Sequence, residues 1–272
     1  MERSQGYLYN TFTNLDGGSS TPSLKPGAQL LSIARPLGRS ELRRFFEMAS
    51  RGFDLRAELL NVARLFYDDV SSILKRFEAL SPFELLISTI VSQNTNWKNV
   101  ERAMKNMRER GLVTVDGVLR ADISELEDAL KVAGLYRVKA RRIKEIAERL
   151  RSWSTGLDDV LSLPFSDARA KLMELPAVGY KTADVMLAFK SRAPVIPVDT
   201  HIERVAKRLG LVDERADYEE VRLALESFVP PQERALFHLA LIKFGREVCR
   251  ARSPSCSRCP VSASCRSSSV RP

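Results

Sequence analysis

The stretch Leu175-Pro-Ala-Val-Gly179-Tyr-Lys181-Thr-Ala183 decides how the middle of this 272-residue chain folds. A helical pattern ends near Leu175 and a second helical pattern begins near Tyr180, so a tight Pro-Ala-Val-Gly turn must join the two helices. In this turn, we expect Gly179 to allow backbone geometry that a Cβ would penalise. The sequence therefore predicts two helices joined by a short turn.

The start of the second helix is a candidate phosphate site. Its first backbone N–H groups have no partner within the helix, and the positive end of the helix dipole lies there. A helix-hairpin-helix uses this arrangement to hold the DNA backbone without reading its sequence. The candidate DNA contacts are Pro176, Val178, Gly179 and Tyr180. The alternative is an ordinary connection between two helices that binds no ligand.

Lys181 lies in the first turn of this second helix, where a lysine works against the helix dipole. Most helical lysines are solvated surface residues. A lysine that acts as a nucleophile needs burial and a nearby carboxylate, so that its neutral amine can attack. Asp199, in Val198-Asp-Thr-His201, is the candidate partner. It is also a preferred residue type for capping a helix over 200–209, and the two roles are compatible.

The rest of the chain from Ser40 onward is dominated by helical patterns and predicts an all-α fold. Ser81 and Glu84 predict a capping box, with Pro82 in the first turn. No alternating segment is long enough for a sheet. Residues 1–40 are rich in turn and linker residues and are expected to be poorly ordered. The expected helices cover 41–49, 83–91, 97–110, 123–133, 136–153, 166–174, 180–190, 200–209, 217–228 and 232–248.

The charge distribution points to an anionic partner. The chain has 43 basic and 34 acidic residues and a net charge of +9, which by itself is weak support for nucleic-acid binding. Residues 137–151 hold seven basic and two acidic side chains, and no acidic residue follows Glu247 although several arginines, including Arg271, do. Such clusters suit phosphate neutralisation. The chain contains no apolar run long enough to span a membrane, and its N-terminus leads into no apolar segment, so we expect an intracellular, DNA-associated protein of the cytoplasm and nucleoid.

All four cysteines of the chain lie within seventeen residues, as a C-x6-C-x2-C-x5-C array. A reducing compartment disfavours disulfides, although three pairings are possible. Four thiolates are the usual ligands of a 4Fe–4S cluster. Zinc sites usually use two close pairs of cysteines, and only Cys256 and Cys259 form such a pair. The spacing therefore favours iron–sulfur over zinc. The four candidate metal ligands are Cys249, Cys256, Cys259 and Cys265.

These three motifs, in this order and spacing, resemble the endonuclease III branch of the helix-hairpin-helix DNA glycosylases, from about Phe83 to Cys265. The resemblance implies a monomer with two helical lobes that binds double-stranded DNA containing damaged or mismatched bases in the cleft between them. The six-helix lobe would span 74–193, and the iron–sulfur lobe would combine 41–73 with 194–267. A tail of 268–272 would follow.

The resemblance also implies residue roles. Lys181 matches the lysine that attacks C1′ of the damaged nucleotide and forms a Schiff base, and Asp199 matches the carboxylate that helps to activate it. Gln93 matches the glutamine that fills the space left by the extruded base, and Leu135 matches a wedge inserted from the other side. Alternatively, Gln93 ends a helix and Leu135 belongs to the core.

The cluster implied by the resemblance is structural or electronic and takes no part in breaking the glycosidic bond. Arg250 and Arg252, in the loop between the first two cysteines, are expected to contact phosphate. Two residues depart from the family pattern. Ala177 replaces a glycine and needs a compatible φ angle, and Tyr180 stands where a basic residue is common.

The predicted function is a base excision repair glycosylase with AP lyase activity on oxidised pyrimidines. The alternatives are a monofunctional glycosylase, which would activate water and act on alkylated purines or on mismatched uracil or thymine, and a non-catalytic iron–sulfur protein that binds DNA. The Gln93-Asn-Thr-x-Trp97 run is similar to that of relatives acting on alkylated purines, so the substrate is less well defined than the reaction.

Overall fold

The computed structural model describes residues 55–269, and within this range it contains helices and no strand, which confirms the all-α prediction. The expected helix 41–49, the extension 1–40, Arg271 and the last three residues lie outside the described residues. In the part of the chain that is described, no helix is both long and apolar enough to cross a membrane.

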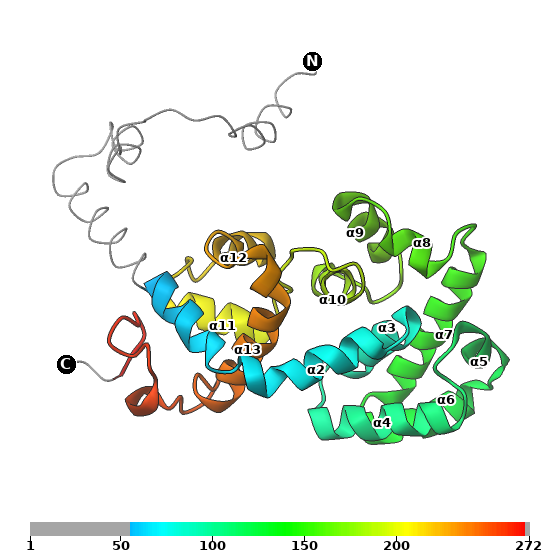
Figure 1. Cartoon of the computed structure of the whole chain (residues 1–272). Helices are drawn as coiled ribbons and strands as arrows, with labels where there is room; N and C mark the ends of the chain where they lie inside the picture. Colours follow the sequence, from blue (N-terminus) through cyan, green and yellow to red (C-terminus); the bar gives the residue numbers. More distant parts are fainter. Residues whose placement is uncertain (1–54, 270–272) are drawn as a thin grey trace, which may run out of the picture. The chain divides into compact units, whose positions relative to one another are not determined.

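Figure 1 shows the helices in chain order. Residues 55–64 are helical, and they are followed by α2 (Tyr67–Ala79), α3 (Pro82–Val91), α4 (Trp97–Glu109), α5 (Val115–Arg120), α6 (Ile123–Leu130), η2 (Lys131–Ala133), α7 (Tyr136–Ser152), α8 (Leu157–Leu161), α9 (Phe165–Met173), α10 (Tyr180–Lys190), α11 (Thr200–Leu209), α12 (Tyr218–Glu226), η3 (Pro231–Glu233), α13 (Arg234–Glu247) and η4 (Cys256–Arg258).

Helix α3 is central and almost wholly buried, because its side chains are apolar on most faces. It packs against α4, α7, α8 and α10. The Ser81 hydroxyl accepts a hydrogen bond from the Glu84 N–H at 3.2 Å, as predicted. The second bond of the predicted capping box is not formed. The Glu84 carboxylate instead accepts a bond from Arg108 Nε on α4 at 2.5 Å, so it ties the two helices together.

Helix α10 lies between two groups of helices (Figure 1). On one side it contacts α3, α8 and α9, and on the other it contacts α2 and α13. Helices α11 and α13 pack on each other, and α13 also packs on α2. Helix α10, which carries Lys181, is therefore held by helices that come from both ends of the described chain.

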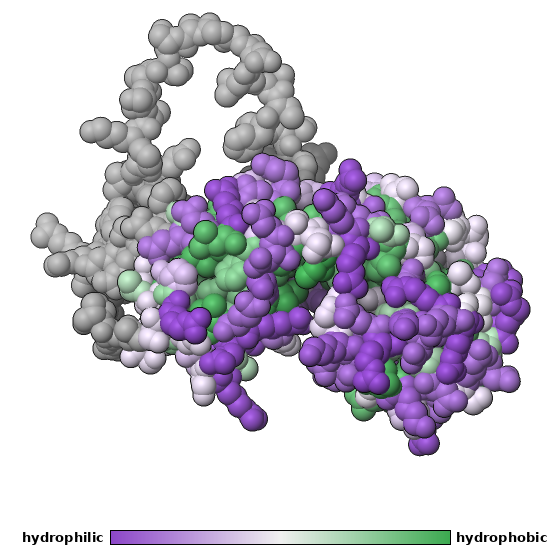
Figure 2. All heavy atoms as spheres, turned by 60° about the horizontal axis from the view of Figure 1, so that its bottom comes forward, coloured by the Kyte–Doolittle hydropathy of each residue, from purple (hydrophilic) through white to green (hydrophobic). Residues whose placement is uncertain are grey.

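Helix α7 packs on α3, α5 and α6 and buries one face. Ile143, Ile146 and Leu150 recur at helical spacing on this face and are buried. Lys139 is buried on the same face. The surface that Figure 2 shows is mainly hydrophilic, with small apolar areas between the polar side chains, as expected when the apolar faces of the helices pack inward.

Candidate active site

The turn between α9 and α10 places a strained residue just before the helix. Ala177 has a φ of 61°, in the left-handed region that favours glycine. Gly179 has a φ of −104°, which any residue adopts, and a Cβ there would meet no atom within 4 Å. The expectation that Gly179 needs the conformational freedom of glycine is therefore wrong, because Ala177 makes the sharp bend. The open space beside Gly179 leaves room for a ligand to approach the helix start.

The other turn residues are placed differently. The Val178 side chain is buried, and its N–H donates to the Leu175 carbonyl at 3.2 Å, so it packs the turn onto the core. Pro176 is half-buried. Tyr180 is 46% exposed and stacks on Tyr218, with ring centroids 5.5 Å apart. No side chain caps α10, which leaves its first N–H groups available to an anion.

Lys181 is the second residue of α10 and is half-buried. Burial lowers the pKa of its ammonium group, Asp199 raises it, and Arg246 lowers it. The carboxylate of Asp199 thus lies close enough to act on Lys181 electrostatically. A lysine with a lowered pKa has a larger neutral fraction near pH 7, which is the form that attacks an electrophile.

Asp199 is held in place by helix capping. Its Oδ1 accepts hydrogen bonds from the N–H groups of His201 and Ile202, both at 2.9 Å, at the start of α11. Both bonds go to the same oxygen, so capping does not engage Oδ2. The structure therefore confirms the predicted helix cap, and the Asp199 carboxylate that it holds in place also acts electrostatically on Lys181.

Gln93 and Leu135 follow the ends of different helices. Gln93 comes just after α3, and its Oε1 accepts a hydrogen bond from Arg142 Nη1 at 3.1 Å. Leu135 directly precedes α7, with a φ of 48°, and is 58% exposed. The alternative that Leu135 belongs to the core is wrong. Leu135 therefore lies at the surface on a strained backbone.

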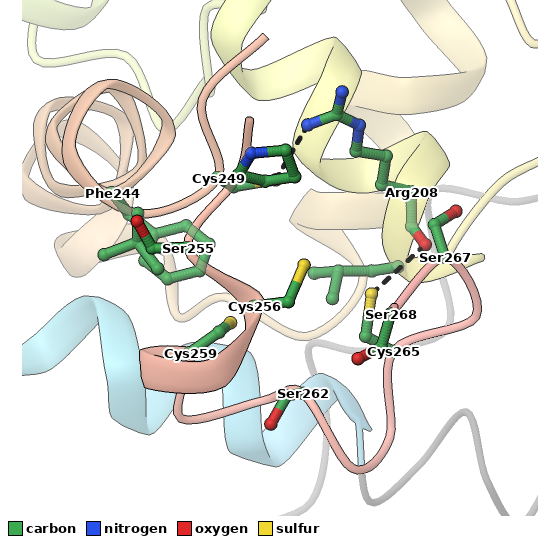
Figure 3. Close-up of a pocket in the computed structure, with 13 residues that line it drawn as sticks. Arg208, Phe244, Cys249, Ser255, Cys256, Cys259, Ser262, Cys265, Ser267 and Ser268 are labelled. Carbon is green, nitrogen blue, oxygen red and sulfur yellow. Dashed lines mark hydrogen bonds between the residues drawn. The ribbon is translucent and has the colours of Figure 1, made fainter. Parts of the chain in front are cut away.

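The four cysteines line one cavity of about 150 Å³ (Figure 3). All four are free thiols, so the structure contains none of the possible disulfide pairings among them. Arg208 contacts two of them. Its Nη1 lies 3.6 Å from Cys249 Sγ, and its carbonyl accepts from Cys265 Sγ at 3.5 Å. Among the described residues, no three His, Cys, Asp or Glu side chains gather closely enough to hold one metal ion.

The predicted basic clusters are only partly available to DNA. In the 137–151 run, the Lys139 and Lys144 ammonium groups turn inward and bind backbone carbonyls, and Arg151 lies 3.1 Å from Asp116. Arg250 and Arg252 are both exposed beside the cysteine cavity, and Arg250 Nη2 donates to the Ser253 carbonyl at 2.9 Å. Charge counts along a sequence do not reveal such inward-facing cations, because folding sets their direction.

Comparison with known proteins decides the family. Residues 87–231 match the family model described as HhH-GPD superfamily base excision DNA repair protein. The chain belongs to the HhH-GPD superfamily. It is 35% identical over 197 residues to the endonuclease III of Thermotoga maritima, covering 71% of this chain and 88% of the relative. It is also 35% identical to the endonuclease III of Bacillus subtilis, over 70% of this chain and 84% of that protein.

The fold of this HhH-GPD protein is similar to that of a trapped endonuclease III–DNA covalent intermediate. The TM-score is 0.62 and the identity 34%, over 75% of this chain and 94% of the solved one. These findings confirm the resemblance read from the sequence and the predicted class of enzyme, a base excision repair DNA glycosylase and lyase. DNA is its partner.

A histidine that the sequence analysis did not single out, His238, lies near Lys181 and Asp199. His238 on α13 is buried, and its Nδ1–H donates to the Pro197 carbonyl at 2.7 Å. Burial lowers its pKa to about 4, with further effects of Asp199 and Lys181, so the ring is neutral and lies near both groups. The chain has only two histidines, and this small number is the one feature of the sequence that could have drawn attention to His238.

A buried ionic network also supports the site. Asp184, one turn after Lys181 on α10, accepts hydrogen bonds from Arg169 Nη2 and from the Tyr218 hydroxyl, both at 2.7 Å. The Tyr218 hydroxyl in turn accepts from the N–H of Val198 at 3.2 Å. Val198 immediately precedes Asp199. The network therefore joins α9, α10 and α12 to the segment that carries Asp199, and it helps to hold the Asp199 carboxylate in place relative to Lys181.

Proposed function

We propose that this enzyme removes a damaged base by attack of Lys181 and then cleaves the strand by β-elimination. The observation that carries the proposal is the environment of Lys181. It is a half-buried amine at an uncapped helix start, beside a carboxylate that helix capping holds in place. This combination gives a nucleophile, an anion-binding helix end and a negative charge at one place.

The chemistry balances as follows. The neutral Nζ of Lys181 attacks C1′, the C1′–N bond breaks, and its electron pair leaves with the base, which takes up a proton. Transfer of a proton from Nζ to O4′ and cleavage of the C1′–O4′ bond, whose electron pair stays on O4′, then open the sugar ring and give a protonated Schiff base. Loss of a C2′ proton then expels the 3′ phosphate. Asp199 stabilises the positive charge that develops at the sugar. The similar endonuclease III was trapped as a covalent intermediate with DNA.

Access to C1′ requires the damaged nucleotide to leave the base stack, which costs a few kcal/mol. We propose that Gln93 and Leu135 fill the vacated space, because one follows α3, the other precedes α7, and Leu135 is 58% exposed. The N–H groups at the start of α10, beside the open Gly179, would hold a backbone phosphate, with Pro176 and Tyr180 alongside. Arg250 and Arg252 would add phosphate contacts.

We infer that the substrate is an oxidised pyrimidine in double-stranded DNA, as in the branch that the sequence resembles, and that the enzyme is a monomeric, intracellular protein. The alternative of a monofunctional glycosylase for alkylated purines or mismatched bases would use Asp199 with water. The environment of Lys181 favours the covalent route, because such an alternative leaves a lysine of lowered pKa without a use.

The four cysteines would hold a 4Fe–4S cluster. They suit this group because four free thiols line one cavity of about 150 Å³, and four thiolates are the usual ligands of such a cluster. The cluster would bind the C-terminal loop together and leave the glycosidic chemistry to Lys181. We also propose the predicted division into a lobe of 74–193 and a lobe that includes 194–267.

Borohydride trapping tests the reaction. The wild-type enzyme would be mixed with duplexes that hold an abasic site, thymine glycol, dihydrouracil, a U:G pair, a T:G pair or an alkylated purine. We expect a covalent adduct on the abasic site and the oxidised pyrimidines. Release of base without an adduct on any duplex would assign the monofunctional class. Tight binding with neither product would assign the non-catalytic class.

Metal analysis of anaerobically purified protein tests the cluster. We expect a yellow-brown protein that contains iron and acid-labile sulfide in equal amounts. A colourless protein with zinc would overturn this assignment. Changing Cys259 to serine should lower the iron content, whereas Ser257→Ala, in the short helix η4 just before Cys259, should leave it unchanged.

A further inference from the structure

Lys139 is a buried lysine whose role the proposed reaction does not explain. It lies on α7, one turn after Leu135, and is only 2% exposed. Burying an ammonium group is costly unless hydrogen bonds replace the water that it loses. The partners that compensate for this cost therefore show what the side chain does.

The partners of Lys139 are the ends of two other helical segments. Its Nζ donates to the carbonyl of Val91 at 2.8 Å and to the carbonyl of Ala133 at 2.9 Å. Val91 is the last residue of α3, and Ala133 is the last residue of η2. Helix-end carbonyls lack a partner within the helix and carry partial negative charge, so they suit an ammonium group.

The two segments that Lys139 joins lead directly to the proposed wedge residues. Gln93 lies two residues after Val91, and Leu135 lies two residues after Ala133. The backbone N–H of Lys139 also donates to the Leu135 carbonyl at 3.0 Å. A single side chain therefore connects both loops at their bases.

Both loops contain a residue with left-handed backbone. Asn94 and Leu135 have φ angles of 54° and 48°; asparagine tolerates this region, whereas it is strained for leucine. Arg142, one turn after Lys139 on α7, holds the Gln93 side chain through its Nη1 at 3.1 Å. The start of α7 thus positions one wedge residue through its side chain and both loops through their backbones.

We propose that Lys139 is a positioning residue that fixes the spacing of the Gln93 and Leu135 loops, so that the two side chains enter the duplex together. This inference rests on the proposed function of those two residues. Loops that were free to move separately would lose conformational entropy on binding DNA, and this loss would offset part of the contact energy. The connection through Lys139 removes that loss before DNA is bound.

Lys144 provides a matched control on the same helix. Its Nζ also donates to three carbonyls, those of Val118, Leu119 and Ala121, at 2.9, 2.9 and 2.8 Å. These carbonyls belong to the end of α5 and lie outside both wedge loops. Lys139→Met and Lys144→Met therefore remove the same kind of interaction from α7, and only Lys139→Met disconnects the loops.

The first measurement is hydrogen exchange of the DNA-free protein. Lys139→Met should speed exchange in both 92–96 and 134–136, and Lys144→Met should speed it near 118–121 only. The second measurement is the ratio of two single-turnover rates of base release, one from a duplex and one from the same damaged strand alone. In the single strand, no vacated space in a base stack has to be filled. Lys139→Met should lower this ratio about tenfold, as expected for the loss of a charged hydrogen bond, and Lys144→Met should leave it unchanged.

Equal ratios in the two variants, or unchanged exchange in either loop of Lys139→Met, would overturn the proposal. If Lys139→Met does not fold, Lys139→Gln keeps one N–H donor and should give a smaller change of the same sign, and no change would again overturn it. A wild-type enzyme that releases no base from any lesion would refute the proposed function alone, because the exchange measurement does not depend on activity.

Discussion

The starts of α7 and α10 are built alike and differ in what their lysines contact. Each helix is entered through a non-glycine residue with positive φ, Leu135 at 48° and Ala177 at 61°. Each carries a lysine in its first turns, and burial lowers the pKa of both Lys139 and Lys181. The two helix starts thus share a lysine in the first turns whose pKa burial lowers, although Lys139 is buried and Lys181 is half-buried.

The hydrogen-bond and electrostatic partners of the two lysines distinguish them. The Lys139 ammonium group is buried and donates to two backbone carbonyls, which hold it in place. Lys181 has no such bond among the described residues, and it lies within electrostatic reach of the carboxylate of Asp199. Burial therefore makes a lysine available for chemistry only where its nitrogen remains accessible.

The largest expected effect is the loss of the reaction in Lys181→Ala. Removing the nucleophile should lower base release and strand cleavage by at least about a thousandfold and abolish the borohydride adduct. Lys139→Met should retain the adduct with an abasic site in a single strand. Single-turnover kinetics and gel analysis of trapped complexes measure both. An adduct of normal yield in Lys181→Ala would move the nucleophile elsewhere.

Asp199→Asn should have the next largest effect. Asparagine caps helices about as well as aspartate, so α11 should remain intact while the charge near Lys181 is lost. The excision rate should fall by roughly a hundredfold. Asp217, which caps α12 through a 2.9 Å bond from the Glu220 N–H, is the matched control. Asp217→Asn should leave the rate unchanged, and equal losses in both variants would assign Asp199 to capping alone.

The pH dependence of base release tests the charges around Lys181. The rate should rise with pH as the ammonium group loses its proton and should level off below the ordinary lysine range, because the pKa of Lys181 is lowered. Asp199 raises this pKa, so Asp199→Asn should move the rising limb to lower pH. Arg246 lowers it, so Arg246→Ala should move the limb to higher pH. If the rising limb moved in the same direction in Asp199→Asn and Arg246→Ala, this electrostatic arrangement would be contradicted.

The smallest effect concerns the backbone at the start of α10. Ala177→Gly should relieve the left-handed strain and raise the free energy of unfolding by about 1 kcal/mol. Ala170 is exposed within α9 and serves as the control. Ala170→Gly should lower the free energy of unfolding by about 1 kcal/mol, since glycine weakens a helix interior. Urea denaturation measures both. A destabilised Ala177→Gly would show that the methyl group of Ala177 makes a contact worth more than the strain.

Most helices could be predicted because their apolar residues recur at helical spacing. Helices α5 and α8 were missed because they have only 6 and 5 residues, too few for a periodic pattern. The prediction also left out α2, whose long helix shows a mixed, weakly apolar face and no capping side chain at its start. The predicted helices 123–133 and 232–248 each divide into a 3₁₀ turn and an α-helix.

By itself, the sequence determined the residue types that this chemistry needs. It placed Lys181 after a tight turn, Asp199 at a helix start and four cysteines within one short segment, because local spacing fixes these relations. The order of the three motifs was enough to indicate the family, which the comparisons confirm.

Only the tertiary structure decided which of these groups meet and in what state. It brought Lys181, Asp199 and His238 together from three helices, and it turned Lys139 and Lys144 inward although their neighbours in the sequence look like a basic surface. The physical reason is that desolvation and hydrogen bonding depend on which segments pack together. Those contacts join residues far apart in the chain, where no local pattern records them.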